Sequence, residues 1–340
     1  MVKYFVGMDI ASNTFMAAVG TQPWKLVVKP QEFENSEDGF AKLLSWLKEH
    51  HLEPHQTVAC MESTGVYGES LAYFLCAKGY RVAVEPPLKV KRAFRPGGPK
   101  TDAVDSCQIA EYACRFEDQL NFWQPRTELL EQIKVLLATR EQFSGQKTAH
   151  QNALQAIKRK VVRTPLAEQV HEQSITQLQK HIHDIDQELR RLINSDPTLK
   201  QMLLLLMSVP GVGLLLAAHM ILLTQTSLDP KELAAYLGIA PNEFSSGTSV
   251  FKKTSSRHYG PSAVRKLLYL ASCSVRTHRE QFRSYFLRKT AEGKSKRLVL
   301  NNIANKLLKI ICAVLRSNTP FIQNYCPIQP LALTRSSYSQ

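Results

Sequence analysis

The feature that most constrains this sequence is an aspartate inside an apolar segment close to the start of the chain. Asp9 is flanked by apolar residues in the segment 3–10, which otherwise predicts a buried β-strand. A carboxylate in the middle of such a strand is destabilising by several kcal/mol unless a cation pairs with it or a metal ion binds it. No obvious fixed cation is close in sequence, so we interpret Asp9 as a metal ligand.

Three further acids are spaced so that an α/β fold would bring them toward Asp9. Glu62 directly follows a predicted strand, and Asp102 and Asp105 are three positions apart at the start of a predicted helix. Residues at that spacing share one helix face. Carboxylates brought together raise each other's pKa unless divalent cations neutralise them, and two metal ions clamping a phosphodiester need a set of this kind. The four acids therefore predict a divalent-metal site.

Each of these three acids also has a structural interpretation. Glu62 taken alone fits a surface carboxylate at a strand end. Asp102 follows the segment 96–99, which is rich in proline and glycine, and could cap the helix N-terminus. Asp105 in the first turn could complement the helix dipole. It is the conjunction of all four that favours the metal site.

The segment 1–125 predicts an α/β domain with a mixed central sheet, because three strands in succession are followed by alternating helices and strands. The expected strands cover residues 3–10, 14–19, 25–29, 57–61 and 81–84. The expected helices are an amphipathic helix capped by Ser36, a helix over 67–78 and a helix over about 102–115.

Residues 126–200 lack strand signals and predict a helical hairpin with coiled-coil character. The second half carries apolar residues in steps of four and three, which is a heptad seam, and Pro165 separates the two halves. The periodicity leaves open whether the seam pairs within the chain or forms a dimer. The seam residues are Leu178, Ile182, Ile185, Leu189 and Leu192.

Residues 201–325 predict a mainly helical domain, and residues 326–340 predict a flexible tail. The apolar run 202–223 is interrupted at its middle by a Pro-Gly turn, so neither half reaches the ~20 residues that span a bilayer. In that turn, Gly211 and Gly213 resemble the hairpin of helix-hairpin-helix modules, whose backbone N–H groups meet a DNA phosphate. A turn that only packs two apolar helices is the alternative.

Positive charge is concentrated in the last part of the chain. Residues 201–340 contain 18 lysines and arginines against 5 acids, whereas residues 1–125 contain 13 against 15. An excess of this size predicts a surface that binds a polyanion.

A polar, Gly-containing loop is expected over residues 238–262, and it includes Ser246 next to a glycine. A serine there could act as a nucleophile toward phosphorus, with Lys252, Lys253 and Arg257 stabilising the developing charge. The residues alone favour ordinary loop composition instead.

The seven cysteines form no Cys-x-x-Cys pair and several lie in apolar stretches, which indicates reduced core residues of a cytosolic protein. The N-terminus runs directly into a predicted strand and shows no signal-peptide pattern. We therefore expect a cytosolic protein without a membrane partner.

In their order and spacing, these segments resemble the DEDD transposases of the insertion-sequence one-ten family, relatives of the Piv DNA invertase and bridge-RNA-guided recombinases. The resemblance covers roughly residues 3 to 320. Its segments are Val6-Gly7-Met8-Asp9-Ile10, Met61-Glu62-Ser63-Thr64-Gly65-Val66-Tyr67, Pro99-Lys100-Thr101-Asp102-Ala103-Val104-Asp105, Val209-Pro210-Gly211-Val212-Gly213, Leu237-Gly238-Ile239-Ala240-Pro241 and Ser246-Gly247.

The resemblance implies a RuvC-like domain of the RNase H fold, a coiled-coil segment and a transposase domain. It implies that the four acids bind one or two Mg²⁺ ions and that Ser246 attacks the DNA backbone to form a covalent phosphoserine. It also implies a homo-oligomer, dimer or tetramer, in which acids and serine come from different subunits. A noncoding bridge RNA would pair with double-stranded donor and target DNA.

Two other functions stay open at this point. A RuvC-type junction resolvase would need the four acids but neither the serine nor a large C-terminal domain. A non-enzymatic nucleic-acid-binding scaffold would need only the basic surface, and the acids would be incidental.

Overall fold

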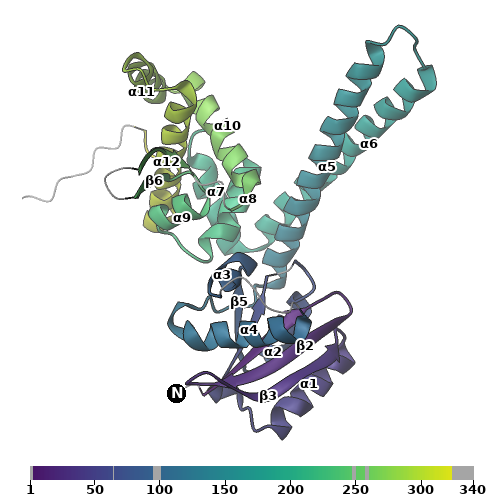
Figure 1. Ribbon diagram of the computed structural model, residues 1–340. Coiled ribbons are helices and arrows are strands. Elements are labelled where there is room, and N and C mark those ends of the chain that lie inside the picture. Colours follow the sequence, from purple (N-terminus) through teal and green to yellow (C-terminus); the bar gives the residue numbers. More distant parts are fainter. Residues whose placement is uncertain (1–2, 64, 95–100, 247–249, 257–259, 324–340) are drawn as a thin grey trace, which may run out of the picture. The chain divides into compact units, whose positions relative to one another are not determined.

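The computed structural model describes residues 3–63, 65–94, 101–246, 250–256 and 260–323 (Figure 1). The chain forms two compact units, Met1–Arg126 and Thr127–Gln340. The second unit contains both the predicted helical hairpin and the predicted C-terminal helices, which share one hydrophobic core.

The first unit is built on a five-stranded mixed sheet in the order β3-β2-β1-β4-β5. β1 pairs antiparallel with β2, which pairs antiparallel with β3, whereas β4 is parallel to both β1 and β5. This is an RNase H-like sheet, and it confirms the predicted mixed α/β class. The strands are β1 (Tyr4–Ile10), β2 (Thr14–Thr21), β3 (Lys25–Glu34), β4 (Thr57–Glu62) and β5 (Arg81–Glu85).

The helices of the first unit cover both faces of this sheet. They are α1 (Glu37–Glu49), α2 (Glu69–Ala77), α3 (Pro87–Arg92) and α4 (Asp102–Arg115), with short 3₁₀ turns η1 (Pro54–Gln56) and η2 (Glu117–Gln119). As predicted, Ser36 caps α1, and its hydroxyl accepts a hydrogen bond from the backbone N–H of Gly39.

Alternate residues of the central strand belong to two different cores, as the two-residue period of a strand requires. Val6 and Met8 pack in a core with α1 and α2, whereas Phe5 packs in a second core with Ile109 and Tyr112 of α4. The odd-numbered residues of β1 therefore face α4. Because Asp9 is odd-numbered, its side chain belongs to the face that α4 covers.

The second unit begins with an antiparallel hairpin of two long helices, α5 (Glu128–Lys158) and α6 (Pro165–Ser195), which run side by side in Figure 1. At the base of the hairpin, Ile185, Leu189 and Leu192 are buried in the core of the unit. This part of the seam pairs within the chain. A dimer through the outer part of the hairpin stays a prediction.

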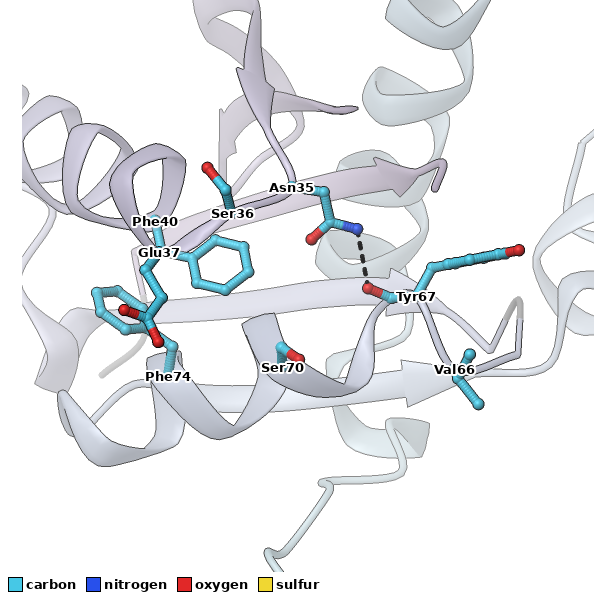
Figure 2. A pocket seen from close by; sticks show the side chains of 8 residues that line it. All are labelled: Asn35, Ser36, Glu37, Phe40, Val66, Tyr67, Ser70 and Phe74. Carbon is cyan, nitrogen blue, oxygen red and sulfur yellow. Dashed lines mark hydrogen bonds between the residues drawn. The ribbon is translucent and has the colours of Figure 1, made fainter. Parts of the chain in front are cut away.

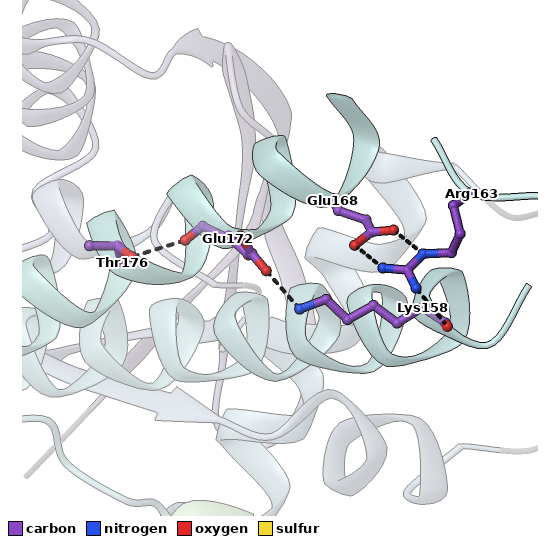
Figure 3. Close-up of polar contacts among 5 residues, drawn as sticks. All are labelled: Lys158, Arg163, Glu168, Glu172 and Thr176. Carbon is purple, nitrogen blue, oxygen red and sulfur yellow. Dashed lines mark hydrogen bonds and ion pairs between the residues drawn. The ribbon is translucent and has the colours of Figure 1, made fainter. Parts of the chain in front are cut away.

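At the far end of the hairpin, the described contacts between the helices include ion pairs on the surface. Arg163 donates two hydrogen bonds to the Glu168 carboxylate, and Lys158 Nζ lies 2.7 Å from Glu172 Oε1 (Figure 3). The nearby Val161 and Val162 are exposed. Exposed ion pairs contribute little to stability, so the hairpin depends mainly on the buried residues at its base.

In the described part of the second unit, six further helices follow the hairpin and confirm its mainly helical class. They are α7 (Pro197–Ser208), α8 (Leu214–Thr224), α9 (Pro230–Tyr236), α10 (Ser262–His278), α11 (Glu280–Ala291) and α12 (Lys296–Ser317). Of the described helices, α12 is long and apolar enough to cross a membrane by length and composition. Its buried side chains, among them Ile303, Leu307 and Ile311, pack in the core of the unit, which identifies it as a core helix.

The predicted loop over 238–262 is wrong in one respect, because it contains a two-stranded antiparallel hairpin. β6 (Pro241–Ser246) pairs with β7 (Val250–Ser256). Strand pairing satisfies backbone N–H and C=O groups that an irregular loop would leave to water. Serine and glycine signal the turn, but they do not reveal whether the flanking segments pair. The predicted tail, 326–340, lies outside the described residues.

We expect Leu189→Ala to lower the free energy of unfolding of the second unit by about 2–5 kcal/mol, because it removes a fully buried side chain from the hairpin base. Lys180→Ala, an exposed position of the same helix, should change it little. Thermal unfolding followed by circular dichroism measures both. Equal midpoints for the two variants would contradict the intrachain packing.

Candidate active site and nucleic-acid interface

Asp9 and Glu62 are brought to one place by the parallel pairing of β1 with β4. The two strands are in register at Met8 and Met61, so the residues after these, Asp9 and Glu62, lie side by side at the ends of the two strands. On β4, Val58 and Cys60 belong to the core that α4 covers. By the same two-residue period, Glu62 faces α4 as Asp9 does.

Gly7 lets α4 approach β1 closely enough to add a third acid. A Cβ atom at this position would lie 2.2 Å from both Ser106 O and Ala110 N, so only glycine fits beneath the helix. Asp105 directly precedes Ser106 and is partly buried. The glycine therefore places the first turns of α4, with Asp105, over the strand face that carries Asp9.

The electrostatics of Glu62 show that these carboxylates act on one another. Burial raises the pKa of Glu62 above its ordinary value, and the negative charges of Asp9 and then Asp105 raise it further. The structure thus brings together three of the four predicted acids, and these oxygen ligands suit a hard divalent cation.

Asp102 is placed differently, because it is exposed at the first residue of α4. The N-cap of this helix is Thr101, whose hydroxyl accepts a hydrogen bond from the backbone N–H of Val104 at 3.3 Å. The capping alternative for Asp102 is therefore wrong. Asp105 in the first turn remains compatible with a helix-dipole role as well as with a metal site.

Across the described residues, no group of three or more His, Cys, Asp or Glu side chains is close enough to hold a metal ion. Asp9 and Asp105 each lie within electrostatic reach of Glu62, but the three acids are not in a coordinating geometry. Carboxylates without a cation repel one another, so closer approach is favourable only when positive charge is supplied.

Ser246 is the last residue of β6 and pairs with Val250 across the turn of the hairpin. Lys252 and Lys253 belong to β7. The side chains of these residues, and all of Gly247 and Arg257, lie outside the described residues. Their predicted roles stay predictions.

The base of this hairpin is fixed to the core by polar side chains that the sequence did not single out. Arg265 Nη1 donates to Leu237 O and Gly260 O at 3.1 Å each, and so ties together the chain before β6 and after β7. Asn301 and Asn305 of α12 both donate to Ile239 O at 2.9 Å. The partners are backbone carbonyls far away in sequence, so no local pattern could have revealed them.

Gly211 and Gly213 lie in the turn between α7 and α8. Gly211 has a φ of +82°, and a Cβ atom there would lie 2.9 Å from Val275 Cγ1 and 3.0 Å from Ala271 O. Close packing against α10 therefore accounts for Gly211. A cavity of about 380 Å³ beside the turn is lined by Gly211, Gly213, Arg140, Asp186 and Arg190. Arg140 donates two hydrogen bonds to the Asp186 carboxylate, so of these two arginines Arg190 is the one that suits the predicted phosphate contact.

Positively charged side chains lie close together on α11 and α12. The charge excess indicated this region, but the sequence did not single out these residues. Lys306 Nζ lies 3.7 Å from the ring centroid of Tyr285, and the Arg288 guanidinium lies 5.8 Å from the same centroid. Burial lowers the pKa of Lys306, and repulsion by Arg288, Lys289 and Lys309 lowers it further. We call Arg288, Lys289, Lys306 and Lys309 the cationic cluster.

Comparison with known proteins gives consistent matches along the chain. Residues 6–161 match the transposase family model for DEDD proteins of the IS110 type, and residues 203–287 match the transposase model of the IS116/IS110/IS902 family. The pilin gene-inverting protein of Moraxella lacunata is 29% identical over 94% of this chain and 98% of its own length.

Two further similarities are weaker. A putative transposase of Sinorhizobium fredii is 24% identical over 78% of this chain and 75% of its own length. Among solved structures, Thermus thermophilus RuvC in complex with a Holliday junction substrate is 14% identical, with a TM-score of 0.26, over 36% of this chain and 99% of RuvC.

The raised pKa of Glu62 predicts how stability depends on pH without metal. Above the ordinary value of 4.5, the folded chain holds this proton more tightly than the unfolded chain, so stability falls as pH rises through the raised pKa. Glu62→Gln removes the charge, and we expect it to raise the melting temperature of the metal-free protein at pH 7 and to have a smaller effect at pH 5. Melting curves at the two pH values measure this. A lower melting temperature for the variant at pH 7 would contradict mutual repulsion.

Proposed function

Because this chain belongs to the IS116/IS110/IS902 family of DEDD transposases, we propose that it is the site-specific recombinase that moves an insertion sequence under the guidance of a noncoding bridge RNA. The observation that carries the chemical part of the proposal is the convergence of Asp9, Glu62 and Asp105 on one face of the sheet. The pilin gene-inverting relative, whose name describes a DNA rearrangement, supports recombination over simple hydrolysis.

A DEDD transposase depends on divalent metal, and we assign the ions to the four acids, with Mg²⁺ as the metal and one or two ions per site. Asp9, Glu62 and Asp105 offer oxygen ligands whose mutual repulsion a cation would relieve. Asp102, exposed at the helix start, would complete the set. Bound metal supplies Lewis-acid polarisation of the scissile phosphate.

Ser246 is the proposed nucleophile. Its hydroxyl oxygen forms a bond to phosphorus, one bond from phosphorus to a deoxyribose oxygen breaks, and the serine proton is balanced by protonation of the leaving oxygen. The phosphoserine conserves the phosphodiester bond for rejoining. The hairpin base, held by Arg265, Asn301 and Asn305, supports a fixed position for the strand that ends in this serine.

DNA and the bridge RNA would bind mainly to the second unit, which holds the excess of lysine and arginine. We assign phosphate contacts to the cationic cluster, to Lys252, Lys253 and Arg257, and to the turn at Gly211 and Gly213. The protein would act as a dimer or tetramer in the bacterial cytosol, associated with the nucleoid, with acids and serine contributed by different subunits.

The proposal is tested by trapping the covalent intermediate. With donor and target DNA and the RNA encoded beside the gene, wild-type protein should form a protein–DNA adduct that survives boiling in detergent. Ser246→Ala should abolish the adduct, whereas Ser245→Ala should retain it because Gly247 follows only Ser246. Asp102→Ala should abolish recombination yet bind nucleic acid nearly as well as wild type.

The alternatives give different results in the same experiment. A metal-dependent resolvase would cut DNA without any adduct, because water would be its nucleophile. A scaffold would bind nucleic acid equally well with or without the acids and show no cleavage. Full strand exchange by Asp102→Ala protein would contradict the four-acid site.

The cationic cluster should contribute to the salt dependence of binding. Removing two phosphate contacts by Lys306→Gln with Lys309→Gln should reduce the slope of log K against log salt by about 2, because each contact releases counterions. The same variant should not lower the melting temperature, since it relieves repulsion within the cluster. Lys42→Gln with Lys48→Gln, exposed on α1, removes equal charge as the control. Equal slopes for both double variants would exclude the cluster from the interface.

A further inference from the structure

Asn35, directly after β3, connects three chain segments near the acids. Its side-chain amide donates to Ala11 O and to Tyr67 O at 3.0 Å each, and its backbone N–H donates to Asn13 O at 2.8 Å. Figure 2 shows the amide nitrogen directed at the Tyr67 carbonyl. Both side-chain partners are carbonyl oxygens, which only accept, so the amide nitrogen and not its oxygen must face them.

The two carbonyls belong to the segments that carry the acids. Ala11 is two residues after Asp9, and Tyr67 closes the segment that begins at Glu62. The pairing of β1 with β4 ends at Met8 and Met61, so each acid is one residue beyond this pairing, although Asp9 still pairs with β2 and Glu62 with β5. Beyond that point, the Asn35 amide links the segment that follows β1 to the segment that follows β4.

A second contact brings the same segments together. A Cβ atom at Gly68 would lie 3.1 Å from Ile10 Cδ1 and 3.2 Å from Met61 Sδ, so the chain after Glu62 folds back over the neighbours of both acids. The bond from Asn35 to Tyr67 O holds the residue directly before this glycine.

Helix capping does not account for the Asn35 amide. The N-cap of α1 is Ser36, whose own hydroxyl accepts from Gly39 N. A cavity of about 660 Å³ lies beside Asn35 and Tyr67 (Figure 2), so Tyr67 is open on this side. The Asn35 amide bond holds the Tyr67 backbone at the edge of this cavity.

We propose that Asn35 is a positioning residue of the metal site. Its side-chain amide hydrogen-bonds the backbone that follows Asp9 and the backbone that follows Glu62, and so fixes the distance between the two carboxylates. The inference rests on the proposed assignment of these acids to divalent metal. Asn35 itself does not bind the ion. Asn35 determines how far the Asp9 and Glu62 carboxylates must move before both can coordinate the same ion.

The test is direct metal binding by the full-length protein, measured by isothermal titration calorimetry with Mn²⁺ alone. Asn35→Asp keeps the shape of the side chain but replaces the donor by an oxygen that repels both carbonyls, and Asn35→Ala removes the group. Both should weaken Mn²⁺ binding by up to about tenfold, the lower limit for a partner that hydrogen-bonds the ligands directly, because Asn35 acts on the backbone beside them. Asn35→Gln, which retains the donor, should recover part of the affinity.

Asn305→Ala serves as the matched control, because it removes an amide-to-carbonyl bond of the same kind in the other unit and should leave the Mn²⁺ affinity unchanged. Glu62→Gln should abolish binding. If Asn35→Asp and Asn35→Ala bind Mn²⁺ as tightly as wild type while Glu62→Gln does not bind it, the positioning role is wrong and the metal site is still supported. Wild-type protein that binds no Mn²⁺ would overturn both. Circular dichroism of each variant confirms the fold, and if Asn35→Asp does not fold, Asn35→Ala and Asn35→Gln decide the case.

Discussion

Repulsion between carboxylates on one sheet face is the interaction on which the candidate site depends. The fold forces it: parallel pairing aligns Asp9 with Glu62, and the missing side chain of Gly7 lets α4 carry Asp105 over them. The metal-free protein therefore holds an arrangement that is unfavourable by itself, with Glu62 resisting ionisation. A site of this kind gives up stability in the free protein in exchange for affinity toward a cation.

In the second unit, side chains of the opposite charge repel one another. In the cationic cluster, partial desolvation and then the charges of its neighbours disfavour the cationic form of Lys306, while the Tyr285 ring beneath it offers only weak compensation. One unit thus concentrates negative charge where a cation would sit, and the other concentrates positive charge where phosphates would lie. Each cluster of like charges is local, and its charge is opposite to that of the ligand proposed for it.

Sequence periodicity predicted what is local and repeated. The order of strands and helices along residues 1–125 predicted the mixed sheet and α4, and the heptad seam predicted the hairpin. The hydrogen bonds from the side chains of Asn35, Arg265 and Asn305 were not predictable from the sequence. Their acceptors are backbone carbonyls that only the tertiary fold brings near these side chains. The β6–β7 hairpin was missed since its serines and glycines gave a turn signal without an alternating apolar pattern to accompany it.

The spread of the acids along the chain has a consequence for synthesis. Asp9, Glu62 and Asp105 come from β1, β4 and α4, so the carboxylate face is incomplete until the last of these elements has left the ribosome and docked on the sheet. The antiparallel strands at the start can form by local contacts, whereas closure by α4 joins residues about a hundred positions apart and comes late. A nascent or truncated chain that ends before α4 would carry two of the acids without the assembled face.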